Sequence, residues 1–174
     1  MSSIAYRKDI DGLRALAVLS VVIFHINSSW LPGGFLGVDI FFVISGYLIT
    51  SIIYKQNKQG VFSFVQFYNR RIKRILPLFF VVLISGVLLS WLLYVPSEVT
   101  WVVDSAVAST LFLANLFFAR GGDYFHPSSD EKVFLHIWSL SVEEQFYFIF
   151  PVLIFLAFKI GFVRKNLLKM VLVL

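Results

Sequence analysis

Arg14 and His25 stand in one apolar stretch near the start of the sequence, eleven positions apart. A helix turns about 100° per residue, so eleven residues make close to three full turns and both side chains leave the same side. The rise over that distance is about 16 Å. A lone imidazole in such a stretch is either a packed, hydrogen-bonded side chain or a group that does chemistry, and both readings stay open.

An aspartate follows in the next apolar stretch, where Gly34 and Gly37 precede Asp39. A carboxylate at the depth of His25 could fix the tautomer of the imidazole and raise its basicity, as an orienting partner does for a general base. The alternative is an aspartate at a helix start, stabilised by the helix dipole. The glycines and Ser45 permit close helix packing, which is a structural role.

Two arginines three positions apart, Arg71 and Arg74, share a helical face within a basic segment. Paired guanidinium groups suit bidentate capture of phosphates. Basic residues at the cytoplasmic end of a helix also serve to set topology or to face lipid headgroups, and from spacing alone that reading is the simpler one. Arg14 can be interpreted in the same way, as a side chain that extends to the membrane–water interface.

Two glutamates, Glu143 and Glu144, lie near the start of a later apolar stretch and are followed by Gln145. His136 and Glu143 are seven apart and share a helical face. The two glutamates point about 100° apart, so at most one of them sits squarely in a common cavity. Two carboxylates and an amide at the start of an apolar helix predict a polar cavity rather than a lipid-facing surface.

The composition indicates the environment in which these residues lie. The chain has 174 residues, of which 59% are hydrophobic and 14% charged, with a mean hydropathy of +0.84. These values exclude a water-soluble globule and a disordered chain. The absence of cysteine excludes disulfide scaffolds, zinc-thiolate sites and cysteine nucleophiles. The net charge of +5 is read as loop topology rather than as affinity for nucleic acid.

We therefore expect an all-α, polytopic bundle of about five membrane segments. A helix needs about 20 apolar residues to cross a hydrocarbon core of about 30 Å. The candidate segments are residues 10–30, 35–54, 75–95, 101–119 and 133–158. The chain stops within a further apolar run at 170–174, so we expect it to be truncated, the N-terminal part of a longer integral-membrane domain with no second domain in residues 1–174.

Basic residues predict the orientation. Residues 55–74 form an expected loop with six Lys or Arg and no acid, and the N-terminus carries Arg7, Lys8 and Arg14. Both should be cytoplasmic. The fourth segment is diluted by polar residues. If it spans, the basic residues after 158 fall outside; if it is re-entrant, they fall inside, and we favour the re-entrant form.

Four ordered motifs resemble the membrane-bound acyltransferase-3 family, which includes bacterial O-antigen and peptidoglycan O-acetyltransferases. The matching stretches are YRKDIDGLRA running to His25, residues 34–48, Arg71-x-x-Arg74 with Pro77, and WSLSVEEQFY at 138–147. The family's membrane domain has about twice as many spans as this chain could encode. Many relatives also carry an extracytoplasmic domain like an SGNH hydrolase, which is absent from these residues.

The resemblance implies transfer of an acyl group, usually acetyl, from cytoplasmic acyl-CoA to a hydroxyl of a surface carbohydrate such as O-antigen, peptidoglycan or exopolysaccharide. It assigns Arg14, Arg71 and Arg74 to the CoA donor. It assigns His25 to catalysis, as nucleophile or as base, and with it Glu143 or Glu144, Glu143 being our choice; Asp39 is added as the orienting partner. No metal is implied. The expected location is the bacterial inner membrane, with lipid, acyl-CoA, a polysaccharide acceptor, the missing C-terminal helices and an SGNH-type domain as partners, and no nucleic acid.

Two other functions fit the same residues. A proton-coupled transporter could relay protons through buried His, Asp and Glu side chains. A catalytically inactive fragment is the third reading, because the polar groups need further helices to enclose them. Modification of a glycan that depends on acyl-CoA separates the first reading from the others.

Overall fold

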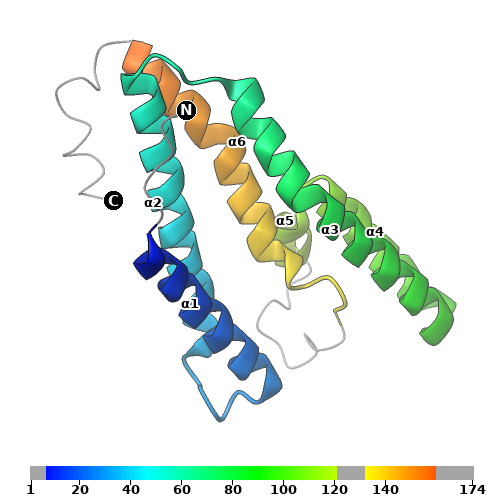
Figure 1. The fold of residues 1–174 in the computed structure, drawn as a ribbon. Helices are drawn as coiled ribbons and strands as arrows, with labels where there is room; N and C mark the ends of the chain where they lie inside the picture. Colours follow the sequence, from blue (N-terminus) through cyan, green and yellow to red (C-terminus); the bar gives the residue numbers. More distant parts are fainter. Residues whose placement is uncertain (1–6, 121–131, 160–174) are drawn as a thin grey trace. The chain divides into compact units, whose positions relative to one another are not determined.

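The computed structural model describes residues 7–120 and 132–159, and every regular element in this part of the chain is helical (Figure 1). The elements in chain order are α1 (Lys8–Ile26), the short 3-10 helix η1 (Gly34–Leu36), α2 (Gly37–Lys58), α3 (Phe64–Leu93), α4 (Pro96–Thr110), α5 (Ala114–Arg120) and α6 (Ile137–Lys159). The predicted all-α class is confirmed.

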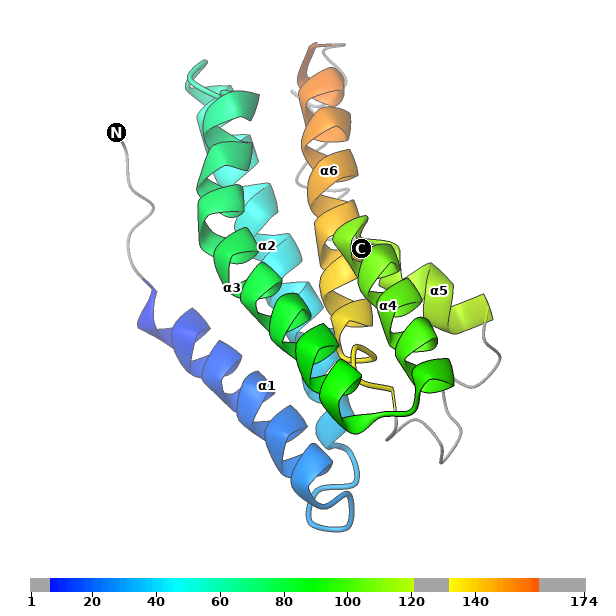
Figure 2. The same cartoon turned by 90° about the vertical axis from the view of Figure 1, so that its right-hand side faces the viewer.

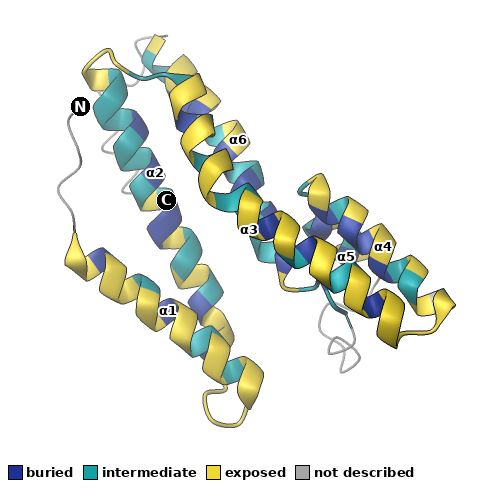
Figure 3. Cartoon of the chain, turned by 45° about the vertical axis from the view of Figure 1, so that its right-hand side comes forward, coloured by how far each residue is buried: buried dark blue, intermediate teal, exposed yellow. Residues whose placement is uncertain are grey.

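Three helical stretches in the described residues are long and apolar enough to cross a membrane by length and composition. They are Gly34–Lys58, Phe64–Leu93 and Ile137–Lys159. Many of their exposed side chains are large and apolar, and Figure 3 shows the exposed positions along α3 and α6. Apolar side chains that face outward fit a lipid environment, where the surrounding solvent is itself hydrocarbon. Three of the five expected segments thus appear as single long helices.

The chain divides into two compact units. The first contains α1, η1, α2 and the second half of α6, and the second contains α3, α4, α5 and the first half of α6. In the first unit, α1 and α2 run antiparallel and meet at their connecting loop (Figure 1). The ring of Tyr54 on α2 lies 5.6 Å from that of Phe158, so the end of α6 packs beside the end of α2.

Two glycines allow α1 and the start of α2 to touch through their backbones. A Cβ atom on Gly37 would lie 2.3 Å from the carbonyl oxygen of Ala17, and one on Gly34 would lie 2.4 Å from that of Ser20. No real side chain tolerates such distances, so only glycine permits this approach. Close packing through small residues is the usual way in which membrane helices associate. The expected packing role is confirmed for these two glycines.

The first expected segment forms a shorter helix than predicted. α1 ends at Ile26 rather than at residue 30 and includes Lys8, Asp9, Asp11 and Arg14 in its opening turns. With its 19 residues it spans about 28 Å, and only the later part is free of charge. Arg7 precedes it and donates hydrogen bonds to Asp9 and, over 3.1 Å, to the hydroxyl of Tyr47. The charged start of α1 is thereby attached to α2.

The basic segment at 55–74, which was expected to be a loop, is mostly helical. The helix that was expected to begin at residue 75 begins eleven residues earlier. α3 begins at Phe64, and Ser63 caps it by accepting a hydrogen bond from the backbone N–H of Gln66. No glycine or proline interrupts the chain until Pro77, so nothing stops the helix from extending beyond the apolar part. Hydropathy measures the lipid-facing length of a helix, not its full length. Arg71 and Arg74 accordingly project from a helix.

The fourth segment, expected over 101–119, is broken into two helices. α4 ends at Thr110 and α5 begins at Ala114, and Phe112 between them has a positive φ of 53°. The Trp101 ring on α4 lies 5.6 Å from the rings of both Phe117 and Phe118, so α5 turns back past α4 (Figure 2). α4 has 15 residues and reaches about 22 Å, which is short of the hydrocarbon core. The segment is therefore not one continuous helix, and the re-entrant form stays a prediction.

The core of the second unit lies where this hairpin meets α3 and the start of α6. Its buried members are Phe79, Leu83, Val102, Ala106, Ala114, Phe118, Phe134 and Ile137. Gly86 permits the closest contact, since a Cβ there would lie 2.6 Å from the Phe134 ring. This core packs α3, which carries the basic candidate residues, against the start of α6, which carries the acidic ones.

Candidate active site

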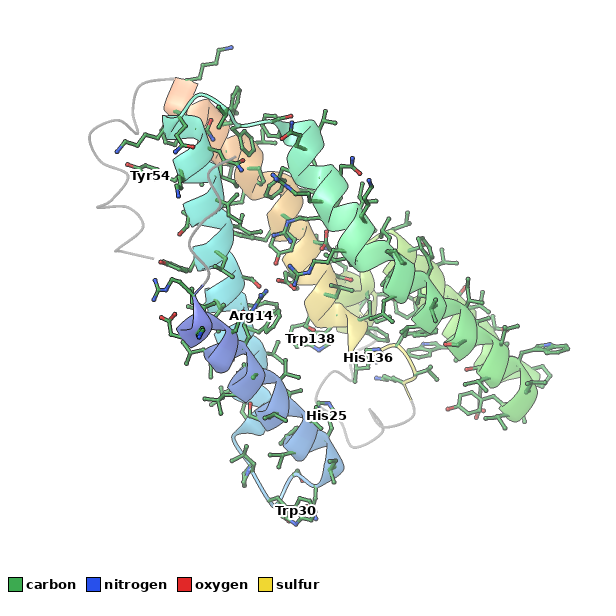
Figure 4. All side chains as sticks on the ribbon, viewed as in Figure 1. Arg14, His25, Trp30, Tyr54, His136 and Trp138 are labelled. Atoms are coloured by element: carbon green, nitrogen blue, oxygen red, sulfur yellow. The ribbon has the colours of Figure 1, made fainter. Side chains whose placement is uncertain are left out.

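Arg14 and His25 lie on one side of α1, as their spacing predicts (Figure 4). Arg14 is half-buried, with its guanidinium carbon 5.3 Å from the centre of the Phe41 ring on α2. Its Nε is buried without a hydrogen-bond partner among the described residues. His25 is exposed in the last turn of the helix.

The hydrogen bond of His25 defines its tautomer. Nδ1 lies 2.8 Å from the backbone carbonyl oxygen of Val21. A carbonyl can only accept, so Nδ1 carries the hydrogen and donates it. In the neutral ring, Nε2 then holds the free lone pair and is the atom available as base or nucleophile. The backbone of the helix therefore fixes the tautomer, which is one of the two effects expected of a carboxylate partner.

Asp39 is exposed in the first turn of α2. No hydrogen bond joins it to His25 in the part of the chain that the structure describes. Its position at a helix N-terminus matches the alternative reading, in which the helix dipole stabilises the carboxylate. Its expected role as orienting partner of His25 stays a prediction.

In the second unit, Arg71 is held between aromatic rings. Its guanidinium carbon lies 3.5 Å from the centre of the Tyr147 ring on α6 and 5.2 Å from that of Phe67 on its own helix. Such stacking is favourable for the planar guanidinium group. Arg74, one turn later, is exposed. The two arginines thus differ: Arg71 is fixed against α6, and Arg74 is open.

The adjacent glutamates have different surroundings. Glu143 is half-buried and accepts a hydrogen bond from the hydroxyl of Tyr147, one turn further along α6. Glu144 is 7% exposed, and its Oε1 has no hydrogen-bond partner in the described residues. Of the two, Glu144 is the more deeply buried carboxylate, and Glu143 is the one with a side-chain hydrogen bond.

Three buried polar atoms in this unit lack partners among the described residues: the Nε of Arg71, the Oγ of Ser141 and the Oε1 of Glu144. Buried polar atoms are nearly always hydrogen-bonded, so a group of unpaired ones requires an explanation. Ser141 and Glu144 are three apart on α6, which places them on neighbouring positions of one face. The arrangement offers one cation, one hydroxyl and one carboxylate to a polar ligand or to water.

Sequence reasoning did not find the role of Tyr147 or of Gln145. Tyr147 is 4% exposed and contacts Arg71 through its ring and Glu143 through its hydroxyl. Its position one turn after Glu143 was visible, but the contact with Arg71 comes from another helix. Gln145 bonds to the α4–α5 break, more than thirty residues earlier. Spacing within one helix carries no signal for either contact.

A cavity of about 750 Å³ lies beside α4 and α5. Its lining is mainly apolar, with Asp104, Arg120 and Lys132 as the charged members, and it contains none of the residues singled out in the sequence. No cluster of three or more His, Cys, Asp or Glu suited to a metal occurs in the described ranges.

The candidate residues are thus divided between the two units. Arg14, His25 and Asp39 belong to the first, and Arg71, Arg74 and the two glutamates to the second. Within the second unit, the structure brings Arg71 against the Tyr147 ring, and the Tyr147 hydroxyl bonds to Glu143.

The apolar helices define a helical membrane protein, and comparison with known proteins gives its family. The family model described as an acyltransferase domain matches residues 7–174, so the chain belongs to the acyltransferase-3 family that its motifs resemble. The O-acetyltransferase OatA of Staphylococcus aureus strain NCTC 8325 / PS 47 and that of strain COL are each 41% identical over 156 residues. The match covers 88% of this chain and 26% of each relative. The chain therefore spans about a quarter of these curated relatives. No solved structure matches it.

Proposed function

We propose that the full-length protein transfers an acyl group, acetyl in the simplest case, from cytoplasmic acyl-CoA to a hydroxyl of an extracytoplasmic carbohydrate. Membership of an acyltransferase family and 41% identity to proteins named O-acetyltransferase support this reading. The structural observation that carries it is that the second unit holds three buried polar atoms without partners among the described residues, on Arg71, Ser141 and Glu144. Such a group within apolar helices serves a polar substrate rather than the stability of the fold.

The arginines are the proposed binding groups for the CoA donor. CoA carries phosphates, and a guanidinium group binds phosphate through two parallel hydrogen bonds. Arg74 is exposed and can meet the nucleotide part of the donor, whereas Arg71 is oriented by the rings of Phe67 and Tyr147. Arg14 is the third proposed cation, at the cytoplasmic start of α1.

His25 is the proposed reacting group, through Nε2. If it is the base, Nε2 takes the proton of the sugar hydroxyl, the sugar oxygen forms a new C–O bond with the thioester carbonyl carbon, and the C–S bond breaks. CoA leaves with the electron pair and is protonated. If it is the nucleophile, an acyl-imidazole forms first and the sugar hydroxyl then displaces the ring. Both routes need the lone pair on Nε2 that the Val21 bond leaves free.

Of the two glutamates, the surroundings favour Glu144 as the carboxylate of the site. It is buried and its Oε1 has no hydrogen-bond partner among the described residues, whereas Glu143 is engaged by the Tyr147 hydroxyl. Glu143, the choice made from the sequence, stays the competing prediction. The two are separable by substitution because each can be changed to the isosteric glutamine.

The proposed location is the bacterial inner membrane, with the N-terminus in the cytoplasm. The basic residues of the N-terminus and of 55–74 support this orientation. A re-entrant α4–α5 hairpin places the basic residues after α6 on the same side as well. The donor phosphates and the basic helix ends are then on the cytoplasmic side, and the acceptor carbohydrate is reached from the opposite side.

The test uses the full-length protein in membranes, with labelled acetyl-CoA and the bacterial cell-wall glycan as acceptor. We expect acetyl ester to accumulate on the glycan with the wild type and not with His25→Ala. Equal membrane-inserted yield of the two proteins is the control, because His25 is exposed and makes only a local bond. An unmodified glycan with the wild type would contradict acyl transfer and favour a transporter. Wild-type acetylation by His25→Ala would remove His25 from the reaction.

A further inference from the structure

The break between α4 and α5 is an unusual feature for a segment within an apolar fold. Phe112 has a φ of 53°, a conformation that few residues other than glycine adopt. The backbone N–H groups of Phe112 and Leu113 donate to Ser109 and Ala108, both over 2.9 Å, and so end α4. The carbonyl of Phe112 points out of the helix. Non-helical backbone at membrane depth requires a partner inside the protein.

Gln145 on α6 supplies that partner. Its Nε2 donates to the Phe112 carbonyl over 2.7 Å and to the Oδ1 of Asn115 over 3.0 Å. Asn115 in turn donates from Nδ2 to the Oε1 of Gln145 over 3.2 Å. The two amides satisfy each other in one orientation only, because turning either would set oxygen against oxygen. Three hydrogen bonds therefore fix the break against α6.

The side chain at the break reaches the two helices that carry the candidate site. The Phe112 ring stacks on Phe79 of α3, with ring centres 5.4 Å apart, and lies 6.4 Å from the Phe148 ring of α6. Phe79 is about two turns along α3 from Arg71, and Gln145 directly follows Glu144. The break is thus connected to α3 through Phe112 and to α6 through Gln145.

We propose that Gln145 is a positioning residue for the acyl-transfer site, and that it acts by fixing the α4–α5 break through the Asn115 amide and the Phe112 carbonyl. This inference rests on the proposed function. Without these hydrogen bonds, the Phe112 carbonyl loses its partner and the α4–α5 hairpin shifts. The Phe112 ring then no longer holds α3 and α6 in place. Small misplacements of reacting groups lower the rate strongly while leaving binding contacts in place. Arg71 and Arg74 remain on α3, so donor binding should be kept.

The experiment measures kcat and KM for acetyl-CoA with the full-length protein in membranes, together with the melting temperature in detergent. Gln145→Leu keeps the side-chain volume and removes the hydrogen bonds. We expect kcat to fall at least tenfold and KM to change less than threefold. Gln66→Leu is the matched control, since Gln66 is an exposed glutamine of the same unit, and it should change neither constant.

A double-mutant cycle and an exchange separate positioning from general destabilisation. Asn115→Leu should also lower kcat, though less than Gln145→Leu because the bond from Gln145 to the Phe112 carbonyl remains. The double variant should be no worse than Gln145→Leu alone, because the two amides act as one pair. The exchange of the two side chains, Asn115→Gln with Gln145→Asn, should recover kcat at least threefold over Asn115→Leu.

An unchanged kcat in Gln145→Leu would overturn the proposal, and so would additive losses in the double variant. A loss of melting temperature with normal kcat per folded molecule would also overturn it, since Gln145 would then serve stability alone. An inactive wild type contradicts the proposed function instead. In that case, the pairing of Gln145 with Asn115 is tested by the melting temperatures of the same variants, which should change non-additively.

Discussion

The guanidinium of Arg71 lies over the face of Tyr147, with its carbon 3.5 Å from the centre of the ring, and the hydroxyl of the same tyrosine bonds to Glu143. One buried side chain thus contacts a cation of α3 and a carboxylate of α6. The adjacent Glu144 is more deeply buried, and its Oε1 has no hydrogen-bond partner among the described residues. The two neighbouring carboxylates therefore differ both in burial and in hydrogen bonding.

Replacement of Tyr147 should separate its two contacts. Tyr147→Phe keeps the ring under Arg71 and frees Glu143, so the affinity for acetyl-CoA should stay within about twofold of the wild type. Tyr147→Leu removes the ring, and cation–π contacts contribute about 0.5–2 kcal/mol, so acetyl-CoA should bind several-fold more weakly. Binding of labelled acetyl-CoA to the full-length protein measures both. Equal affinities of the Phe and Leu variants would show that the stacking does not orient Arg71 for the donor.

The glutamates should respond unequally to removal of their charge. Glu144→Gln should lower kcat by about two orders of magnitude, in the range that a positioned acid–base or charged group contributes. Glu143→Gln should lower it less than tenfold, because glutamine still accepts from the Tyr147 hydroxyl. Initial rates of glycan acetylation measure the two effects. The reverse order would restore Glu143 as the residue of the site.

The donor arginines should be distinguishable from their basic neighbours. Arg71→Lys and Arg74→Lys keep the charge and lose the planar fork, so each should raise KM for acetyl-CoA about tenfold. Arg70→Lys is the control, because Arg70 is exposed on the same helix beside them and has no proposed role. If all three lysine variants behave like the wild type, the arginines serve topology rather than donor binding.

The approach of α1 to α2 should depend on one glycine. Gly37→Ala sets a methyl group 2.3 Å from the Ala17 carbonyl and 2.4 Å from the Ser20 hydroxyl, so the helices must separate. Overpacking of this kind costs about 1–3 kcal/mol. Gly46→Ala is the matched control on the same helix, where an added Cβ meets nothing within 4 Å, and alanine there should be neutral or stabilising by up to about 1 kcal/mol. The melting temperature in detergent compares them. Equal melting temperatures would mean that the two helices are not in backbone contact.

The helices could be located from the sequence because apolar runs of the required length are rare outside membranes. The helix ends were harder to predict, since α3 includes basic residues that a hydropathy criterion leaves out of the helix. The α4–α5 break was not predictable locally: no glycine or proline occurs at 111–113, and a glutamine of another helix fixes it. The difference between Glu143 and Glu144 likewise depends on Arg71 and Tyr147, whose contact is tertiary.

The two side chains that hold the α4–α5 hairpin to α6, Asn115 and Gln145, are both amides, so the membrane potential exerts no net force on them. A full charge that moves across a membrane gains or loses about 2.3 kcal/mol per 100 mV. Asn115 and Gln145 carry no net charge and cannot titrate. The hairpin therefore keeps one geometry whether the cell is energised or depolarised, and whatever the proton gradient. Any response to voltage or pH must enter through the arginine, histidine and carboxylate groups, and not through the frame that holds the hairpin.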